Sequence, residues 1–180
     1  MDSSAKPHSS YGKLSIALHW LMLVLLAAVY AAILLRENYP RGSEIREALK
    51  AWHFTLGLSV FVLVWLRIFA RSVAPPHHGP SSWDARIAIV VHVALYVLMV
   101  AMPILGWLAL SADGKPIPFF GLELPPLTVT DKAFAEQVEE VHETLGTVGY
   151  WLVGAHAAAA LFHHYVLRDG TLRRMLPGRT

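Results

Sequence analysis

Residues 141–164 read VHETLGTVGYWLVGAHAAAALFHH, an apolar stretch in which histidines recur at wide spacing. His142 and His156 are fourteen residues apart, and Gly149 stands midway between them. In an α-helix this spacing amounts to roughly 21 Å of rise and a net rotation of only about 40°. The stretch is also long enough to cross the roughly 30 Å hydrocarbon core of a bilayer. It therefore predicts a membrane-spanning helix that presents two imidazoles to one side at different depths.

Three further stretches of the chain have the same apolar character. Of the 180 residues 55% are hydrophobic and only 16% are charged, a composition typical of membrane proteins. The formal charge of +2 and the lack of phosphate-binding or zinc-binding motifs give no support to nucleic-acid binding. We expect an all-α integral membrane protein in which residues 1–180 form a single membrane domain. Its four-helix bundle should span the bilayer at about residues 14–35, 48–70, 87–110 and 141–167, with an outer loop at residues 111–130.

The basic residues are distributed unevenly between the two sides of this bundle. With a cytoplasmic N-terminus, nine of the 15 lysines and arginines lie on the inner side and six on the outer side. Because positive charge favours the cytoplasmic side, this distribution predicts that both termini are cytoplasmic. The inner set is Lys6, Lys13, Arg67, Arg71, Arg86, Arg168, Arg173, Arg174 and Arg179.

Histidines on two other predicted helices supply partners for those of the fourth helix. His19 lies near the inner end of the first helix and His53 near the outer end of the second. By depth, His19 therefore pairs with His156, and His53 pairs with His142. Two imidazoles on opposite faces of an iron porphyrin give a six-coordinate centre suited to electron transfer. Since the chain has no cysteine, iron–sulfur clusters and covalent c-type haem are excluded, and the pattern predicts two haems b.

The same histidines lie in stretches that resemble the bacterial cytochrome b561 family, of the kind known as superoxide oxidase. The matching stretches are SIALHWL at 15–21, WHFTLG at 52–57, VHETL at 141–145 and GAHAAAALFHHY at 154–165. The resemblance extends from about Tyr11 to Pro177. It implies that the haem ligands are His19, His53, His142 and His156.

The resemblance also implies a function and a location. The expected place is the bacterial inner membrane, the expected donor is superoxide or another small reductant at the outer face, and the expected acceptor is ubiquinone. Other members of the wider family are haem-carrying subunits, so a non-catalytic carrier or anchor for a periplasmic dehydrogenase or hydrogenase is an alternative. A haem-free channel or transporter that uses its histidines for protons is a second alternative.

Charged side chains near the expected haems form a second group of candidates. Arg67 follows His53 by fourteen residues, which places it at the depth of the inner haem, where it could bind a propionate; the alternative is snorkelling to the headgroups. Arg46 and Lys50 precede His53 on one helix face. They could hold outer propionates or steer an anion such as superoxide, and simple surface solvation is the alternative.

Two histidines after His156 are candidates for binding a quinone. His163 and His164 lie near the expected inner surface, where an imidazole could bind a quinone carbonyl or simply face lipid headgroups. His92 and Trp20 could line the same pocket, although His92 also suits a hydrogen bond within the bundle.

Several small features refine the expected helices. Gly57, Gly146 and Gly149 should leave space for flat macrocycles. Pro103 should kink the third span, and residues 131–140 should extend the fourth helix beyond the bilayer.

Overall fold

The computed structural model describes residues 12–73 and 83–176, and this part of the chain is almost entirely helical. Lys6 and Arg179, which enter the charge count, lie outside the described residues, as do Tyr11 and Pro177 at the ends of the resemblance. Within these described ranges four helices are long and apolar enough to cross a membrane, which confirms the expected fold class. They are α1 (Lys13–Leu35), α2 (Glu44–Val73), α3 (Trp83–Asp113) and α4 (Lys132–Phe162).

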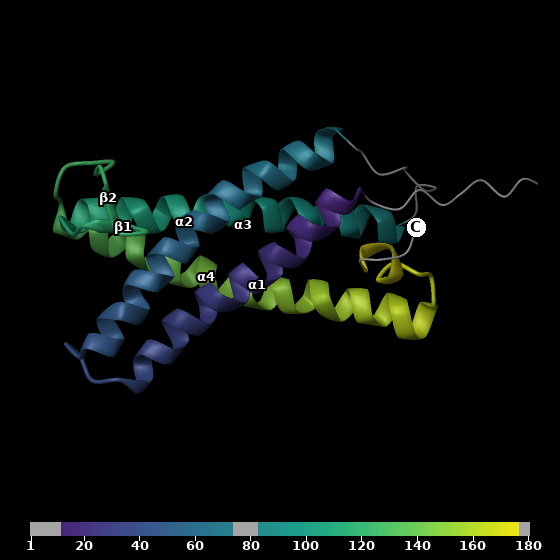
Figure 1. The fold of residues 1–180 in the computed structure, drawn as a ribbon, viewed down its shortest axis with the longest axis horizontal. Coiled ribbons are helices and arrows are strands. Elements are labelled where there is room, and N and C mark those ends of the chain that lie inside the picture. Colours follow the sequence, from purple (N-terminus) through teal and green to yellow (C-terminus); the bar gives the residue numbers. More distant parts are fainter. Residues whose placement is uncertain (1–11, 74–82, 177–180) are drawn as a thin grey trace, which may run out of the picture.

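The helices pack mainly as two antiparallel pairs, α1 with α2 and α3 with α4, and α2 also contacts α3 (Figure 1). The core between the pairs includes Met22 of α1 and the fully buried Val64 of α2, with Tyr96 and Met99 of α3 packed against them. Most other apolar side chains face outward, as expected for helices whose solvent is lipid.

A short turn joins α1 to α2 and is fastened by one arginine. The chain continues from α1 into a single 3-10 turn, η1 (Arg36–Asn38), before α2 begins. The Arg46 guanidinium donates hydrogen bonds to the carbonyls of Arg36 and Tyr39, at 2.9 and 3.0 Å, and pairs with the Glu37 carboxylate. The turn therefore has a fixed shape because one side chain satisfies its carbonyls.

The segment between α3 and α4 forms a two-stranded hairpin within the expected outer loop. Strands β1 (Ile117–Phe119) and β2 (Leu122–Leu124) pair antiparallel, with Ile117 opposite Leu124. Phe120 and Gly121 make the turn with φ of 50° and 80°, the left-handed geometry that two-residue hairpins favour.

The hairpin is seated on the helices by packing and hydrogen bonds. Ile117 is only 2% exposed and packs against Leu58 of α2 and Leu110 of α3. The Thr55 hydroxyl donates to the Pro118 carbonyl, and the Trp107 indole N–H donates to the Pro125 carbonyl. The end of the bundle that carries the hairpin and the α1–α2 turn is called the hairpin end below.

The opposite end, where α1 begins and α4 finishes, is called the terminal end. Here α4 passes into a π-helical turn, η2 (His163–Leu167), and the chain then turns back through a left-handed Arg168 to the short η3 (Arg173–Met175) (Figure 1). The Trp20 indole N–H donates to the Met175 carbonyl at 2.7 Å, which ties this returning segment to α1.

The helices extend beyond the expected spans at several ends. Helix α2 begins at Glu44, α3 covers Trp83–Asp113, and α4 begins at Lys132, so residues 132–140 are helical as expected. The Asp131 carboxylate caps α4 by accepting the Phe134 backbone N–H at 3.1 Å. Pro103 lies inside α3, which continues through it.

Candidate functional site

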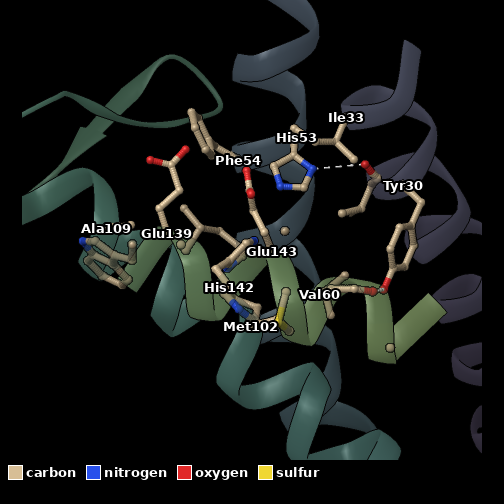
Figure 2. Close-up of a pocket in the computed structure, with 18 of the residues that line it drawn as sticks. Tyr30, Ile33, His53, Phe54, Val60, Met102, Ala109, Glu139, His142 and Glu143 are labelled. Atoms are coloured by element: carbon tan, nitrogen blue, oxygen red, sulfur yellow. Dashed lines mark hydrogen bonds between the residues drawn. The ribbon is translucent and has the colours of Figure 1, made fainter. Parts of the chain in front are cut away.

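At the hairpin end, His53 of α2 and His142 of α4 face each other across the interior of the bundle (Figure 2). Their ring centres are 6.2 Å apart and their planes are inclined at 81°. The His53 Nδ1 lies 3.1 Å from the Val29 carbonyl of α1. Because that carbonyl can only accept, Nδ1 carries the proton, and the Nε2 lone pair remains available for a ligand.

At the terminal end, His19 of α1 and His156 of α4 form a second pair of nearly the same geometry. Their ring centres are 6.4 Å apart and their planes are inclined at 80°. His92 of α3 also contacts His156, with ring centres 5.3 Å apart. The structure thus brings together the two pairs that depth along the helices predicts, and adds His92 beside one of them.

The separations within the pairs can be compared with what a shared metal requires. An imidazole nitrogen binds a transition metal at about 2.0–2.1 Å and the ring centre lies roughly 1 Å behind it, so two opposed imidazoles on one metal place their centres about 6 Å apart. The pairs at 6.2 and 6.4 Å agree with this value. The 5.3 Å between His92 and His156 is shorter, so His92 fits as a packing neighbour.

A cavity of about 770 Å³ opens between the helices around His53 and His142. This is within the range of small-molecule and cofactor sites. Gly57 lines the cavity, and a Cβ built on it would meet no atom within 4 Å. The His142 Nδ1 is buried and has no hydrogen-bond partner that meets distance and angle criteria within the described residues. The backbone carbonyl of Met102 is close enough to interact electrostatically with the ring.

Tyr30 occupies the space expected over the central glycines of α4. Its hydroxyl donates to the Gly146 carbonyl at 2.9 Å, and a Cβ built on Gly149 would stand only 2.8 Å from the Tyr30 hydroxyl oxygen. Gly149 therefore admits a tyrosine from α1 midway between the two histidine pairs. The small residue is needed there for a helix contact, while Gly57, Gly146 and Gly149 all line the cavity.

Arg67 is a buried cation at the level of the terminal-end pair. Its residue surface is only 9% exposed, its Nε donates to the Tyr96 hydroxyl at 3.2 Å, and one terminal nitrogen has no partner among the described residues. The guanidinium also acts electrostatically on both His19 and His156. A buried guanidinium with an unsatisfied N–H suits an anionic ligand such as a carboxylate.

The two expected steering residues are placed differently. Lys50 lines the cavity. Arg46 is not among the described residues that line the cavity, and its guanidinium instead donates hydrogen bonds to carbonyls of the α1–α2 turn. The cavity lining also includes Arg36 and Lys115 and the acidic Glu37, Asp113, Glu139 and Glu143. The charged rim therefore mixes both signs.

The two histidines expected to bind a quinone lie in the π-helical turn η2. His163 is paired through Nδ1 with the Asp169 carboxylate at 2.6 Å. The ring of His164 packs edge-on against Tyr165, with ring centres 4.8 Å apart. The sequence singles out His163 as a candidate but gives no indication of its partner Asp169.

Other residues near the histidines are only weakly marked in the sequence and are not predicted from it. Tyr30 lies eleven residues after His19, with nothing in its surroundings to mark it. Tyr96 and Asp169 become partners of Arg67 and His163 only through the packing of α3 and the return of the chain after α4. A polar residue in an apolar span, as Tyr96 is, could have been singled out because it needs a hydrogen-bond partner there.

Comparisons with known proteins agree along nearly the whole chain. Cytochrome b561 homolog 1 of Escherichia coli is 35% identical over 175 residues, covering 94% of this chain and 98% of that protein. The protein named "Probable superoxide oxidase CybB" of Yersinia pestis is 36% identical over 173 residues, covering 94% of this chain and 97% of its own. Cytochrome b562 of Cereibacter sphaeroides is 30% identical over 174 residues, covering 94% and 96%.

The model of one protein family, described as prokaryotic cytochrome b561, matches residues 10–178. This range includes all four histidines of the two pairs and the buried Arg67. The four apolar helices and the metal-compatible histidine spacing fit a membrane protein of electron transfer that binds haem b. The chain belongs to the prokaryotic cytochrome b561 family.

Proposed function

We propose that this protein holds two haems b and transfers electrons across the membrane from a small donor at the hairpin end to a quinone. The observation that carries the proposal is the presence of two histidine pairs, at 6.2 and 6.4 Å, whose members on α4, His142 and His156, are fourteen residues apart. His53 and His142 would hold one haem, and His19 and His156 the other. Haem b, when bound, supplies a reversible one-electron couple.

The protein's own residues orient these sites. The Val29 carbonyl fixes the tautomer and the plane of His53, which keeps Nε2 directed to a ligand. Tyr96 holds the Arg67 guanidinium by Nε, so the remaining nitrogens are available to a propionate. Gly57 leaves the cavity open beside His53.

Superoxide is the proposed donor, with ubiquinone as the acceptor. The name of the Yersinia pestis relative supports this choice of donor. An anion of this size needs only close approach to an exposed haem edge beside positive charge, and Lys50 at the cavity supplies such a charge. His163 and His164 are the proposed quinone-binding side chains at the terminal end.

The proposed location is the bacterial inner membrane, with the hairpin end outside and both termini in the cytoplasm. The support is the excess of lysine and arginine on the terminal side of the spans. A reporter enzyme that folds only outside the cytoplasm should be inactive when fused to the C-terminus. Activity of that fusion would reverse the orientation.

One observation favours a second function, that of an electron-carrying subunit bound to a periplasmic redox partner. Four carboxylates, of Glu37, Asp113, Glu139 and Glu143, line the same cavity as Lys50, and they weaken attraction of a small anion. The same carboxylates would attract a protein donor that has a basic surface of its own.

The ligand assignment is tested with single variants and a matched control. His19→Ala or His156→Ala should remove one haem and leave the other, whereas His92→Ala, which alters a neighbour of the same pair, should retain both. Haem content and the visible spectrum of purified protein give the readout. Two haems in His156→Ala would contradict the pairing, and a wild type without haem absorbance would select a haem-free channel or transporter.

The donor and the acceptor are tested by a superoxide pulse on purified, oxidised protein. Rapid haem reduction, followed by reoxidation when ubiquinone is added, is the expected result. Lys50→Gln should slow the reduction and weaken its dependence on ionic strength, because one attracting charge is lost. Normal haem spectra without any response to superoxide would favour the carrier subunit.

A further inference from the structure

The segment that follows α4 is built around one short contact. The His163 Nδ1 and an Asp169 carboxylate oxygen are 2.6 Å apart. The other carboxylate oxygen accepts the Thr171 backbone N–H at 2.8 Å, and the Asp169 N–H donates to the His163 carbonyl at 3.3 Å. Both oxygens of the carboxylate are thus oriented, and the ring is fixed against it.

The charge on Asp169 determines which ring nitrogen of His163 carries the proton. Partial burial acts to raise the pKa of this carboxyl, but hydrogen bonds from Thr171 and His163 outweigh it and lower the pKa to about 2. The carboxylate is therefore ionised at neutral pH and can only accept. Nδ1 must donate to it, and Nε2 is left to exchange a proton with another molecule.

This pair contributes little to holding the fold together, because it is open to solvent. The side chains of His163 and Asp169 are 31% and 37% exposed, and ion pairs at such positions are screened by water. The same exposure leaves the imidazole accessible from outside the bundle, beside Asp169, which lies beyond the candidate membrane span that ends at Leu167. The geometry therefore suits proton exchange better than structural support.

The pair also lies at the end of the bundle that carries the second histidine pair. His163 follows His156 by seven residues, or about two helical turns. The segment that contains Asp169 is tied to α1 at Trp20, whose ring packs against His19 with centres 5.7 Å apart. The returning segment thus connects the two helices that carry His19 and His156.

We infer that His163 and Asp169 form a proton-transfer site for the quinone, in which His163 donates the proton and Asp169 is its positioning residue. This inference rests on the proposed function. Reduction of a quinone to a hydroquinone consumes two electrons and two protons, and each carbonyl oxygen becomes a hydroxyl. Two molecules of the one-electron donor at the hairpin end supply the electrons.

The protons come from the terminal end, through the ring of His163. Nε2–H passes its proton to a carbonyl oxygen of the quinone, the ring is reprotonated from water, and a second transfer completes the hydroquinone. Without such a donor, reduction would leave an anion in a medium of low dielectric, which is costly. Asp169 stabilises the imidazolium before each transfer and holds the ring in the tautomer that exposes Nε2.

The experiment compares two oxidants of the pre-reduced, haem-loaded protein: a short-chain ubiquinone, which takes up protons, and ferricyanide, which does not. His163→Gln should slow reoxidation by the quinone by about 100-fold, and Asp169→Asn by roughly tenfold, since a general acid typically contributes 10²–10⁴. Neither variant should change the rate with ferricyanide. Glu123→Gln, which neutralises an exposed carboxylate of the hairpin, should change neither rate.

Further variants separate positioning from a structural role. The double variant should be no slower than His163→Gln alone, because Asp169 acts through His163, and Asp169→Glu should recover part of the rate. Nitrogen NMR of labelled histidine gives a readout independent of turnover: the proton should reside on Nδ1 of His163 in the wild type and redistribute in Asp169→Asn.

Three results would overturn the inference. Equal slowing with both oxidants would mark a structural defect, an unchanged quinone rate in Asp169→Asn would exclude its role, and a neutral wild-type ring whose single proton resides on Nε2 would exclude the tautomer. Wild-type protein that ferricyanide reoxidises and the quinone does not would overturn the proposed function itself, and this inference with it. The first three results leave the proposed function intact, so the two failures are distinguishable.

Discussion

Gly57 and Gly154 are both helical glycines above which a methyl group would meet no protein atom within 4 Å, but only Gly57 lines the cavity beside His53. Alanine at either position should favour the helix by about 0.5–1 kcal/mol. In Gly57→Ala the methyl group would enter the space proposed for a haem. We expect this variant to fold and to lose haem from the hairpin-end pair, whereas Gly154→Ala should keep both haems. Haem content per chain measures the difference, and full occupancy in Gly57→Ala would place the haem elsewhere.

Arg67 offers a second test at single-residue scale. A charge-assisted hydrogen bond to a propionate contributes about 1.5–3 kcal/mol, so Arg67→Gln should weaken retention of the terminal-end haem by roughly 10- to 100-fold. Loss of the nearby positive charge should also lower its reduction potential. Arg71→Gln, one turn further along α2, is the control. Redox titration and competition with a haem acceptor measure both effects, and equal behaviour of the two variants would remove the propionate role.

The two histidine pairs could be predicted from the sequence because helical periodicity alone determines depth and direction along an apolar span. The surroundings of the histidines could not be predicted in this way. Tyr30 fills the space over Gly149, and His92 packs on His156, through crossing angles and offsets between helices that no single helix encodes. Arg46 is a similar case. Its position on the helix predicts a cation on the same face as His53, but the guanidinium donates hydrogen bonds to carbonyls of the neighbouring turn, which the helix alone does not reveal.

The α1–α2 turn depends on Arg46 as an element. Its guanidinium satisfies the carbonyls of Arg36 and Tyr39, so Arg46→Ala should destabilise the protein by about 1–2 kcal/mol. Arg41→Ala, which removes an exposed cation of the same turn, should have little effect. Thermal unfolding in detergent, followed by haem absorbance, measures the change. A normal melting temperature together with slower reduction by superoxide would instead assign Arg46 to steering.

The segment after α4 should respond to acid through Asp169. Because the pKa of this carboxyl is lowered from its ordinary 3.8 to about 2, its stabilising contribution is complete above about pH 4 and is lost as the pH falls through about 2. The Thr171 backbone N–H donates to the same carboxylate, so its amide resonance reports the titration. We expect a midpoint near pH 2 by NMR, with no such step in Asp169→Asn. A midpoint at the ordinary value would mean that the contacts do not persist in solution.

At the scale of elements, the four helices follow from length and hydropathy, while the hairpin does not. The sequence of residues 111–130 indicates a stiff, proline-rich loop, and Phe120 is an unusual residue for a positive φ. The strands form because Ile117 is buried against α2 and α3 and because Thr55 and Trp107 hold the neighbouring carbonyls. These are long-range contacts, so a short stretch of sequence read alone gives no sign of them.

On the scale of the whole molecule, the helices divide into two halves, α1 with α2 and α3 with α4. His19 and His53 belong to the first half, and their partners His156 and His142 both belong to α4. Each proposed haem would therefore join one half to the other. The cavity at the hairpin end lies across the same division, with lining residues from all four helices. Haem binding should then fix the relative position of the halves as well as the redox chemistry.

This role as a link predicts a structural change when haem is removed. Since the chain has no cysteine, spin labels can be placed at single introduced cysteines without altering native thiols. Labels at the exposed positions Val24 and Val148, one in each half, should give a narrow distance distribution in the haem-loaded protein and a broader one without haem. A second label pair at Val24 and Val62, both within the first half, should stay narrow in both states because α1 and α2 contact each other directly. Pulsed electron–electron double resonance measures the widths of the distance distributions, and His142→Ala should give an intermediate width because the His19–His156 link remains.

Equal widths with and without haem would show that protein contacts alone hold the halves together. The histidine pairs would then serve electron transfer and have no structural role.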